Sequence, residues 1–86
     1  MSSAAETIAQ TTVRFAPSMA AHLEEVGVQG FLETRIDALP LDSLDSLELI
    51  MDIEDQLGIS LPEDGVLACS TIGELTELAE KARHLA

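Results

Sequence analysis

Three stretches of the sequence repeat apolar residues at helical spacing, and glycine and proline residues separate them. Apolar side chains that recur every three or four residues share one face of an α-helix. Gly27 and Gly58 are placed to end the first two helices. The sequence therefore predicts an all-α fold whose three main helices cover residues 4–26 (Ile8, Phe15, Met19, Leu23, Val26), 42–57 (Leu49, Ile53, Leu57) and 71–85 (Ile72, Leu75, Leu78, Ala79, Ala82, Leu85).

Two further segments connect these helices. Pro62 suits the first position of a short helix through Ala68, anchored by Val66 and Leu67. Residues 27–41 hold two glycines and Pro40 without sustained periodicity, which predicts a loop that covers the core with Phe31, Leu32, Ile36 and Leu39. The expected architecture is a small helical bundle of three main helices plus one short helix.

Pro17 lies inside the first apolar stretch and leaves two outcomes open. It kinks one long helix, or it begins the true helix and leaves residues 1–15 partly frayed. The 86 residues are enough for one compact domain and too few for a second core, so a single domain over residues 1–86 is expected.

The acidic residues outnumber the basic ones by 16 to 4, which gives a net charge of −12. Such a charge disfavours nucleic acid and anionic membrane surfaces as partners and favours proteins with basic patches. The hydrophobic fraction of 47% is too high for a disordered chain. Because Trp and Tyr are absent, the core must be mainly aliphatic, which favours packed helices over a β-sandwich.

Cys69 is the single cysteine, so an internal disulfide and a zinc site with cysteine ligands are excluded. The residue is interpreted as a buried thiol rather than a nucleophile, and no metal site is predicted. Residues 1–12 lack the basic start and apolar run of a signal peptide, and no apolar stretch approaches transmembrane length. We expect a cytoplasmic monomer without membrane insertion.

The segment from Asp37 to Asp64 contains nine acids and no Lys or Arg. Within the second helix, acids at spacings of three, four and three form one stripe, and apolar residues lie beside it, away from the predicted buried face. An apolar strip framed by acids predicts a docking face, although a merely solvated face is the alternative. The residues of this predicted docking face are Leu44, Asp45, Leu47, Glu48, Met51, Asp52 and Asp55.

Ser43 directly follows Asp42, the expected N-cap of the second helix. Free backbone N–H groups and the helix dipole favour a phosphate attached to a hydroxyl at this position. A lone Asp-Ser-Leu is far more often a simple helix cap than an attachment site, so the flanking sequence has to decide between the two.

The stretch Leu41–Leu49 (LDSLDSLEL) resembles the acyl carrier protein family, whose hallmark is Asp-Ser-Leu followed by an acidic helix studded with apolar residues. Further matches follow downstream without a gap, and the resemblance covers about residues 39–80. These matches are Ile50-Met51, Glu54-Asp55, Leu61-Pro62-Glu63-Asp64 and Ser70-Thr71-Ile72-Gly73.

The resemblance implies that a phosphopantetheinyl transferase attaches 4′-phosphopantetheine from coenzyme A to Ser43. The thiol of this arm would carry acyl groups as thioesters, and the chain itself would not be an enzyme. Asp42 would cap the helix and help to place the serine. Acyl-loading, synthase or transferase enzymes would meet the docking face through basic patches, and a cavity lined by Leu49, Ile53 and Leu75 would shelter the acyl chain.

Ser46 lies in a second Asp-Ser-Leu and is a rival attachment site. Only counting from Ser43 places Leu47, Glu48 and Leu49 as the family has them, so the register favours Ser43.

The sequence departs from the housekeeping carriers of fatty acid synthesis. Pro40 stands where glycine is usual, the first loop is shorter, Leu67 replaces a frequent acid, and Asp52 adds one. These departures favour a carrier for polyketide or other specialised acyl biosynthesis. The alternatives are a housekeeping fatty acid carrier, a carrier of aminoacyl or peptidyl groups, and an unmodified acidic helical adaptor.

Overall fold

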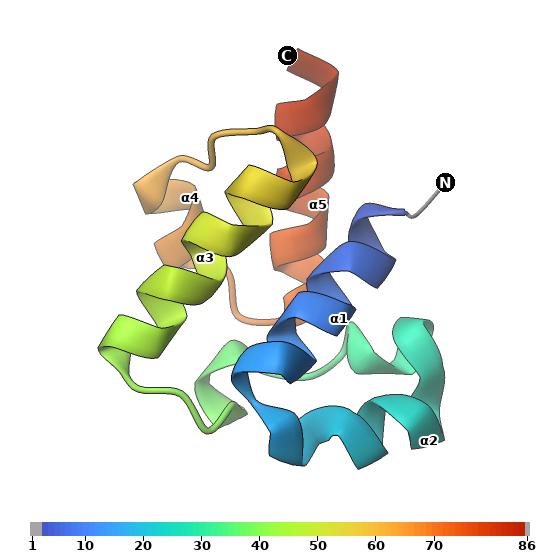
Figure 1. Ribbon diagram of the computed structural model, residues 1–86. Helices are drawn as coiled ribbons and strands as arrows, with labels where there is room; N and C mark the ends of the chain where they lie inside the picture. Colours follow the sequence, from blue (N-terminus) through green and yellow to red (C-terminus); the bar gives the residue numbers. More distant parts are fainter. Residues whose placement is uncertain (1–2, 86) are drawn as a thin grey trace.

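A computed structural model describes residues 3–85 and confirms the predicted all-α class (Figure 1). The chain turns sharply between α1 and α2, so that α2 crosses the end of the bundle opposite the C-terminus. Helix α1 packs against α2, α3 and α5, and α4 packs against α5. The elements of residues 3–85 are α1 (Ala4–Phe15), η1 (Pro17–Met19), α2 (Ala20–Phe31), η2 (Ile36–Ala38), α3 (Ser43–Leu57), α4 (Glu63–Ala68) and α5 (Ile72–Leu85), where η denotes a 3₁₀-helix.

Pro17 divides the first predicted helix into two separate helices. Ala16 leaves the helical region, with φ −129° and ψ 73°, and Pro17 then begins a 3₁₀ turn that leads into α2. The break occurs here because proline has no N–H to donate to the preceding turn. The bundle therefore has four longer helices within residues 3–85 where three were predicted.

Partial fraying of residues 1–15 is one of the two outcomes that the sequence leaves open, and the part of this segment from Ala4 to Phe15 is helical in the structure. Helix α1 begins after Ser3, whose hydroxyl accepts a hydrogen bond from the Glu6 amide at 3.1 Å. Ile8 and Ala9 are fully buried. Because α1 supplies part of the core, tertiary packing stabilises this helix in addition to its cap. Residues 1–2 lie outside the described range.

Gly27 interrupts α2 as predicted, but the chain does not become a loop there. The residue has φ 74° and ψ 175°, a conformation that glycine adopts without steric cost. Helical backbone then resumes for one turn and ends at Phe31, which is completely buried. The prediction of a loop over residues 27–31 is therefore wrong, and Val26, expected on the buried face, is 39% exposed.

Helix α3 has the predicted boundaries and both predicted caps. The Asp42 carboxylate accepts a hydrogen bond from the Asp45 amide at 2.8 Å. Gly58 adopts the left-handed conformation, with φ 65°, and ends the helix. Leu49 and Ile53 are buried, so the predicted apolar face of this helix is confirmed.

Helix α4 begins one residue after Pro62, which occupies the N-cap position. Val66 is half-buried against the core, as expected. Leu67, by contrast, is 76% exposed and does not anchor the helix. A six-residue helix has room for one buried face only, and Val66 rather than its neighbour lies on it.

Helix α5 begins with the predicted capping box. The Glu74 amide donates to Thr71 Oγ1 at 3.1 Å, and the Thr71 amide donates to Glu74 Oε1 at 3.2 Å. Ile72, Leu75 and Ala79 form its buried face, while the side chain of Leu85 lies outside the description. No helix within residues 3–85 has the length and apolarity needed to cross a membrane.

Backbone hydrogen bonds tie the segment after α2 to the start of α5. The Ile36 amide donates to the Ser70 carbonyl at 2.9 Å, and the Gly73 amide donates to the Leu32 carbonyl at 2.7 Å. At Gly73 a Cβ atom would lie 3.0 Å from the Leu32 carbonyl oxygen, so only glycine permits this close approach without adjustment. These bonds anchor the chain that leads into the N-terminus of α3.

Candidate functional site

Ser43 is the first residue of α3, and its side chain is exposed. The first backbone bond of the helix runs from the Ser46 amide to the Asp42 carbonyl at 2.9 Å, so the Ser43 and Leu44 amides precede the helical ladder. Such amides and the helix dipole stabilise an anion held at a helix N-terminus. A phosphodiester on the Ser43 hydroxyl would benefit from both.

A pocket of about 610 Å³ opens beside Ser43, between α3 and α4. Its wall is predominantly apolar, with Ser46 and Glu54 among its polar members. An exposed hydroxyl at a helix N-terminus next to an apolar pocket fits a phosphate-linked arm that carries a hydrophobic group. The main apolar residues of the wall are Leu41, Leu47, Ile50, Leu61, Val66 and Leu67.

The three residues predicted to line an acyl cavity lie in the packed core of this structure. Leu49, Ile53 and Leu75 are 4%, 0% and 1% exposed, and they belong to the closed core rather than to the pocket beside Ser43. Helix α3 directs Leu49 and Ile53 into the packed interior, whereas Ser43, Leu47, Ile50 and Glu54 line the pocket from an adjacent face. Burial in the core and access to the pocket are therefore properties of two different faces.

The apolar part of the predicted docking face is exposed to solvent. Leu44 is 62% exposed, and Leu47 and Met51 are each 57% exposed. Glu48 and Asp55 are also exposed on α3. We define the α3 outer face as Leu44, Leu47, Glu48, Met51 and Asp55.

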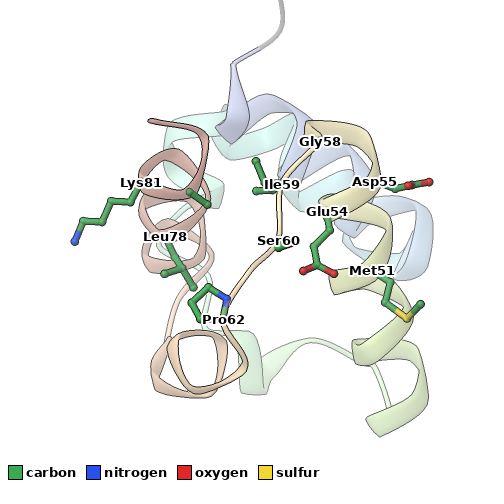
Figure 2. Close-up of a pocket in the computed structure, with 10 residues that line it drawn as sticks. Met51, Glu54, Asp55, Gly58, Ile59, Ser60, Pro62, Leu78 and Lys81 are labelled. Atoms are coloured by element: carbon green, nitrogen blue, oxygen red, sulfur yellow. The ribbon is translucent and has the colours of Figure 1, made fainter. Parts of the chain in front are cut away.

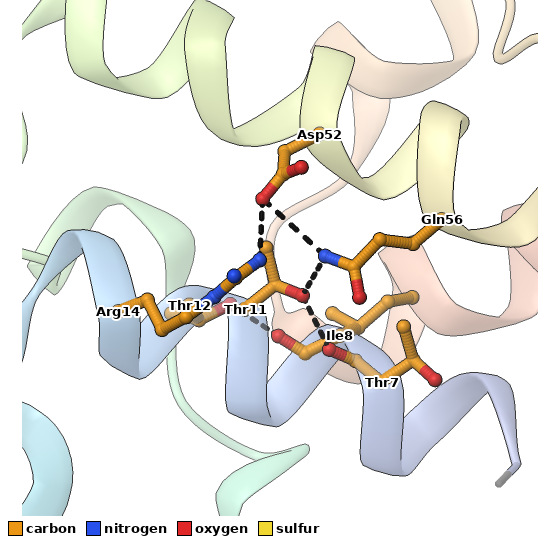
Figure 3. A network of polar contacts seen from close by, with 7 residues as sticks. All are labelled: Thr7, Ile8, Thr11, Thr12, Arg14, Asp52 and Gln56. Carbon is orange, nitrogen blue, oxygen red and sulfur yellow. Dashed lines mark hydrogen bonds and ion pairs between the residues drawn. The ribbon is translucent and has the colours of Figure 1, made fainter.

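Asp52 does not belong to the α3 outer face. Its Oδ2 atom forms an ion pair with Arg14 of α1 at 2.6 Å and accepts a bond from Gln56 at 3.3 Å (Figure 3). The same Gln56 Nε2 donates to Thr11 of α1 at 2.8 Å. The assignment of Asp52 to partner binding is therefore corrected, because this carboxylate faces α1.

Asp45 also differs from the exposed acids. Its side chain is half-buried, and its backbone amide receives the Asp42 cap. The predicted stripe of four acids thus separates into Glu48 and Asp55, which are exposed, and Asp45 and Asp52, which are half-buried.

Ser46 is less suited than Ser43 to modification by another protein. Its side chain is half-buried, and its amide already donates to the Asp42 carbonyl within the first helical turn. Both serines line the pocket, but only Ser43 is exposed. The geometry therefore agrees with the register argument in favouring Ser43.

Glu54 lines the pocket, although the sequence analysis gave it no separate role within the acidic run. Its Oε2 atom accepts a hydrogen bond from the Leu61 amide at 2.7 Å, in a partly buried position. The spacing of the sequence places Glu54 on the same helix face as Ser43, because residues 43, 47, 50 and 54 recur at helical intervals. That pattern would have separated Glu54 from the exposed acids.

Cys69 is a half-buried thiol, and its Sγ atom donates a hydrogen bond to the Gly65 carbonyl at 3.2 Å. Burial raises the pKa of the Cys69 thiol, and the carboxylates of Glu74 and Glu77 raise it further. A raised pKa lowers the thiolate fraction at neutral pH, so Cys69 is a poor nucleophile there.

Comparison with known proteins agrees with this geometry. The chain matches the family described as "Phosphopantetheine attachment site" over residues 18–79, which is most of its length. It is also similar to the acyl carrier protein of Sinorhizobium fredii and to acyl carrier protein AcpP of Rhizobium meliloti. Each is 40% identical over 48 residues, which cover 56% of this chain and 62% of the relative. The similarity to these two proteins spans less than two thirds of their length. The family match over residues 18–79 includes α3 and the residues that line the pocket. The chain therefore belongs to the acyl carrier protein family of phosphopantetheine-attachment domains.

Proposed function

We propose that this protein is an acyl carrier that holds acyl intermediates as thioesters on 4′-phosphopantetheine attached to Ser43. The observation that carries the proposal is the exposed Ser43 hydroxyl at the capped N-terminus of α3, beside a mainly apolar pocket. The family match supports the prosthetic group, whose thiol supplies the thioester chemistry. We further propose that residues 1–86 act as one carrier domain.

The attachment step transfers the phosphopantetheinyl group from coenzyme A to the serine. The Ser43 Oγ–phosphorus bond forms, the diphosphate bond of coenzyme A breaks, and adenosine 3′,5′-bisphosphate leaves. The hydroxyl proton passes to a base of the transferase. In this step Ser43 supplies the nucleophilic oxygen, and Asp42 keeps the first turn of α3 in place through its cap.

The α3 outer face is the proposed docking surface for the transferase and for enzymes that load, extend or transfer the acyl group. Glu48 and Asp55 would attract basic patches on these enzymes, while Leu44, Leu47 and Met51 would contact apolar side chains. The net charge of −12 supports basic protein partners. The lone cysteine is compatible with action in the reducing cytoplasm.

For the pathway, we propose polyketide or other specialised acyl biosynthesis. Leu67 supports this assignment, because it exposes an apolar side chain where housekeeping fatty acid carriers often have an acid. Its exposure of 76% allows it to contact a partner enzyme. Loading the chain with candidate acyl groups by the host's own enzymes would identify the pathway.

Intact-mass measurement tests the attachment site. After incubation with coenzyme A, magnesium and a broad-specificity phosphopantetheinyl transferase, the wild type should gain one phosphopantetheinyl group. Ser43→Ala should gain none. Ser46→Ala is the matched control and should be modified like the wild type. A wild type that remains unmodified, or an arm located on Ser46, would contradict the proposal.

A further inference from the structure

Glu54 holds the segment after α3 through both its backbone and its side chain. Its carbonyl oxygen accepts bonds from the Gly58 amide, which closes the helix, and from the Ile59 amide at 3.0 Å. Its carboxylate accepts the Leu61 amide at 2.7 Å. The segment from Gly58 to Leu61 is thus fixed to the last turns of α3 by one residue, and Leu61 itself is buried in the core.

Glu54 also stands between two pockets. The pocket beside Ser43 lies toward the first half of α3, and a second pocket of about 970 Å³ lies between the end of α3 and helix α5. Met51 and Glu54 line both. Figure 2 shows the Glu54 carboxylate directed toward Ser60 and the segment that leads to Pro62, with Leu78 of α5 across from it. The carboxylate and the segment it holds therefore form the boundary between the two spaces.

This boundary is polar, whereas much of the space on either side is apolar. An alkyl chain that enters from Ser43 and follows α3 would pass Leu47 and Ile50 before Glu54, because these pocket residues succeed one another along one face of the helix. Continuing past this point would require the chain to displace the segment that Glu54 holds and to break the bond between the Glu54 carboxylate and the Leu61 amide. Leaving this partly buried amide without an acceptor is unfavourable, so the chain gains little from additional carbons beyond Glu54.

We propose that Glu54 limits the length of the acyl chain that the protein shelters, by holding the Gly58–Leu61 segment closed between the two pockets. Glu54 is a positioning residue, since it acts through the Leu61 amide. The inference rests on the proposed acyl-carrier function. It implies that the sheltered acyl chains are short enough to end before Glu54. It also predicts that removing the Glu54 side chain lets a longer acyl chain extend into the second pocket.

The experiment compares acylated forms of the intact protein. A series of saturated acyl-pantetheine arms of increasing length, from butanoyl to hexadecanoyl, is attached to Ser43 from the corresponding acyl-coenzyme A compounds, and loading is verified by intact mass. The thermal midpoint of each form is measured relative to the free-thiol form. The chain length at which the midpoint stops rising reports the sheltered length, because each methylene stabilises the fold only while it is buried.

Four variants separate the roles of charge, reach and hydrogen bonding. Glu54→Ala removes the side chain, and Glu54→Asp keeps the charge but is too short to reach the Leu61 amide in the same way. Glu54→Gln keeps an acceptor oxygen at full length. Glu80→Ala removes one exposed acid of α5 that lines neither pocket, and it is the charge control.

In the wild type, Glu54→Gln and Glu80→Ala, the midpoint should stop rising at the same chain length. In Glu54→Ala and Glu54→Asp, the plateau should move to a longer chain by one or more members of the series. An unchanged plateau in Glu54→Asp, or a wild-type midpoint that ignores chain length, would overturn the inference. Failure to load Ser43 at all would overturn the proposed function as well, and the mass measurement distinguishes that outcome.

Discussion

The roles of the two carboxylates at Asp42, the N-cap of α3, and Asp52, within α3, depend on the groups that each one contacts. Asp42 caps the first turn through the Asp45 amide, which keeps the helix beginning at Ser43. Asp52 has the same chemical group nearly three turns further on but pairs with Arg14 at 2.6 Å. The first therefore contributes to the attachment site, and the second connects α3 to α1.

Cys69 provides a prediction at the residue scale. Because burial and the nearby carboxylates raise its folded pKa, the neutral thiol stabilises the fold. This contribution is fully present below the unfolded pKa and is lost as pH rises through the folded pKa. At mildly alkaline pH, iodoacetamide should modify Cys69 more slowly in the native protein than in urea, and the phosphopantetheine thiol of the holo protein should react first.

The measurement is the modification rate of each thiol, located by peptide mass. Cys69→Ala should weaken the decline of the urea midpoint as pH rises into the alkaline range. Equal rates for Cys69 in the native and denatured states would contradict the assignment of a protected thiol.

Helix α3 performs several tasks. One face carries Leu49 and Ile53 into the core, and an adjacent face lines the pocket beside Ser43. The α3 outer face remains exposed and shares Leu47 and Met51 with the pocket wall. A fourth side connects to α1 through Asp52 and Gln56 (Figure 3). A helix of 15 residues has about four turns, so one element can contribute to the core, the pocket and the exposed surface at once.

At the element scale, the α3 outer face should control how fast enzymes associate with the carrier. Reversing both Glu48 and Asp55 to Lys should slow modification by a transferase with a basic docking patch, by about tenfold or more at low salt. The wild-type rate should fall as salt is added, and the variant should lose most of this dependence. Stopped or quenched time courses analysed by intact mass measure both effects.

Asp52→Asn is the matched control for this experiment. It removes an acid from the same helix, but one that faces α1, so its modification rate should stay close to the wild-type rate. It should instead lower the free energy of unfolding by less than about 1 kcal/mol, since the Arg14 side chain of this ion pair is 62% exposed and solvent screens the interaction. A strong rate effect of Asp52→Asn with none for Glu48 and Asp55 would contradict the division of faces.

For the whole molecule, the excess of acidic residues leaves much of the charge without a nearby cation. Arg14 pairs with Asp52, and Arg35 pairs with Asp37 at 3.1 Å, whereas the total charge is −12. Repulsion among like charges is stronger in the compact state than in an expanded chain. The fold therefore tolerates a charge distribution that favours basic partners at a cost in stability.

Added salt should therefore stabilise the protein. The urea midpoint should rise between low and moderate sodium chloride concentrations, because screening weakens the repulsion. Glu80→Lys, which reverses an exposed charge on α5, should raise the midpoint at low salt and reduce its response to added salt. A midpoint that does not respond to salt in either protein would show that the charges are individually compensated.

Several features of the protein depend only on residues close together in the chain and can be predicted from them. The all-helical class, the ends of α3 at Asp42 and Gly58, and the capping box of Thr71 and Glu74 follow from spacing and from local hydrogen-bonding chemistry. The same holds for Ser43 as a candidate site, because its position at a helix N-terminus is a local property. Caps and helical periodicity span only a few residues, so the sequence contains the information for them.

The tertiary structure sets which face of each helix meets which neighbour, and this could not be predicted from one element at a time. It placed Asp52 against Arg14 of α1 instead of on the docking surface, and it buried Leu49 and Leu75 in the core instead of in the pocket beside Ser43. It also kept α1 helical up to Phe15 and bound Glu54 to the Leu61 amide. These outcomes depend on the relative positions of helices far apart in the sequence, where burial and long-range contacts override patterns read along one element.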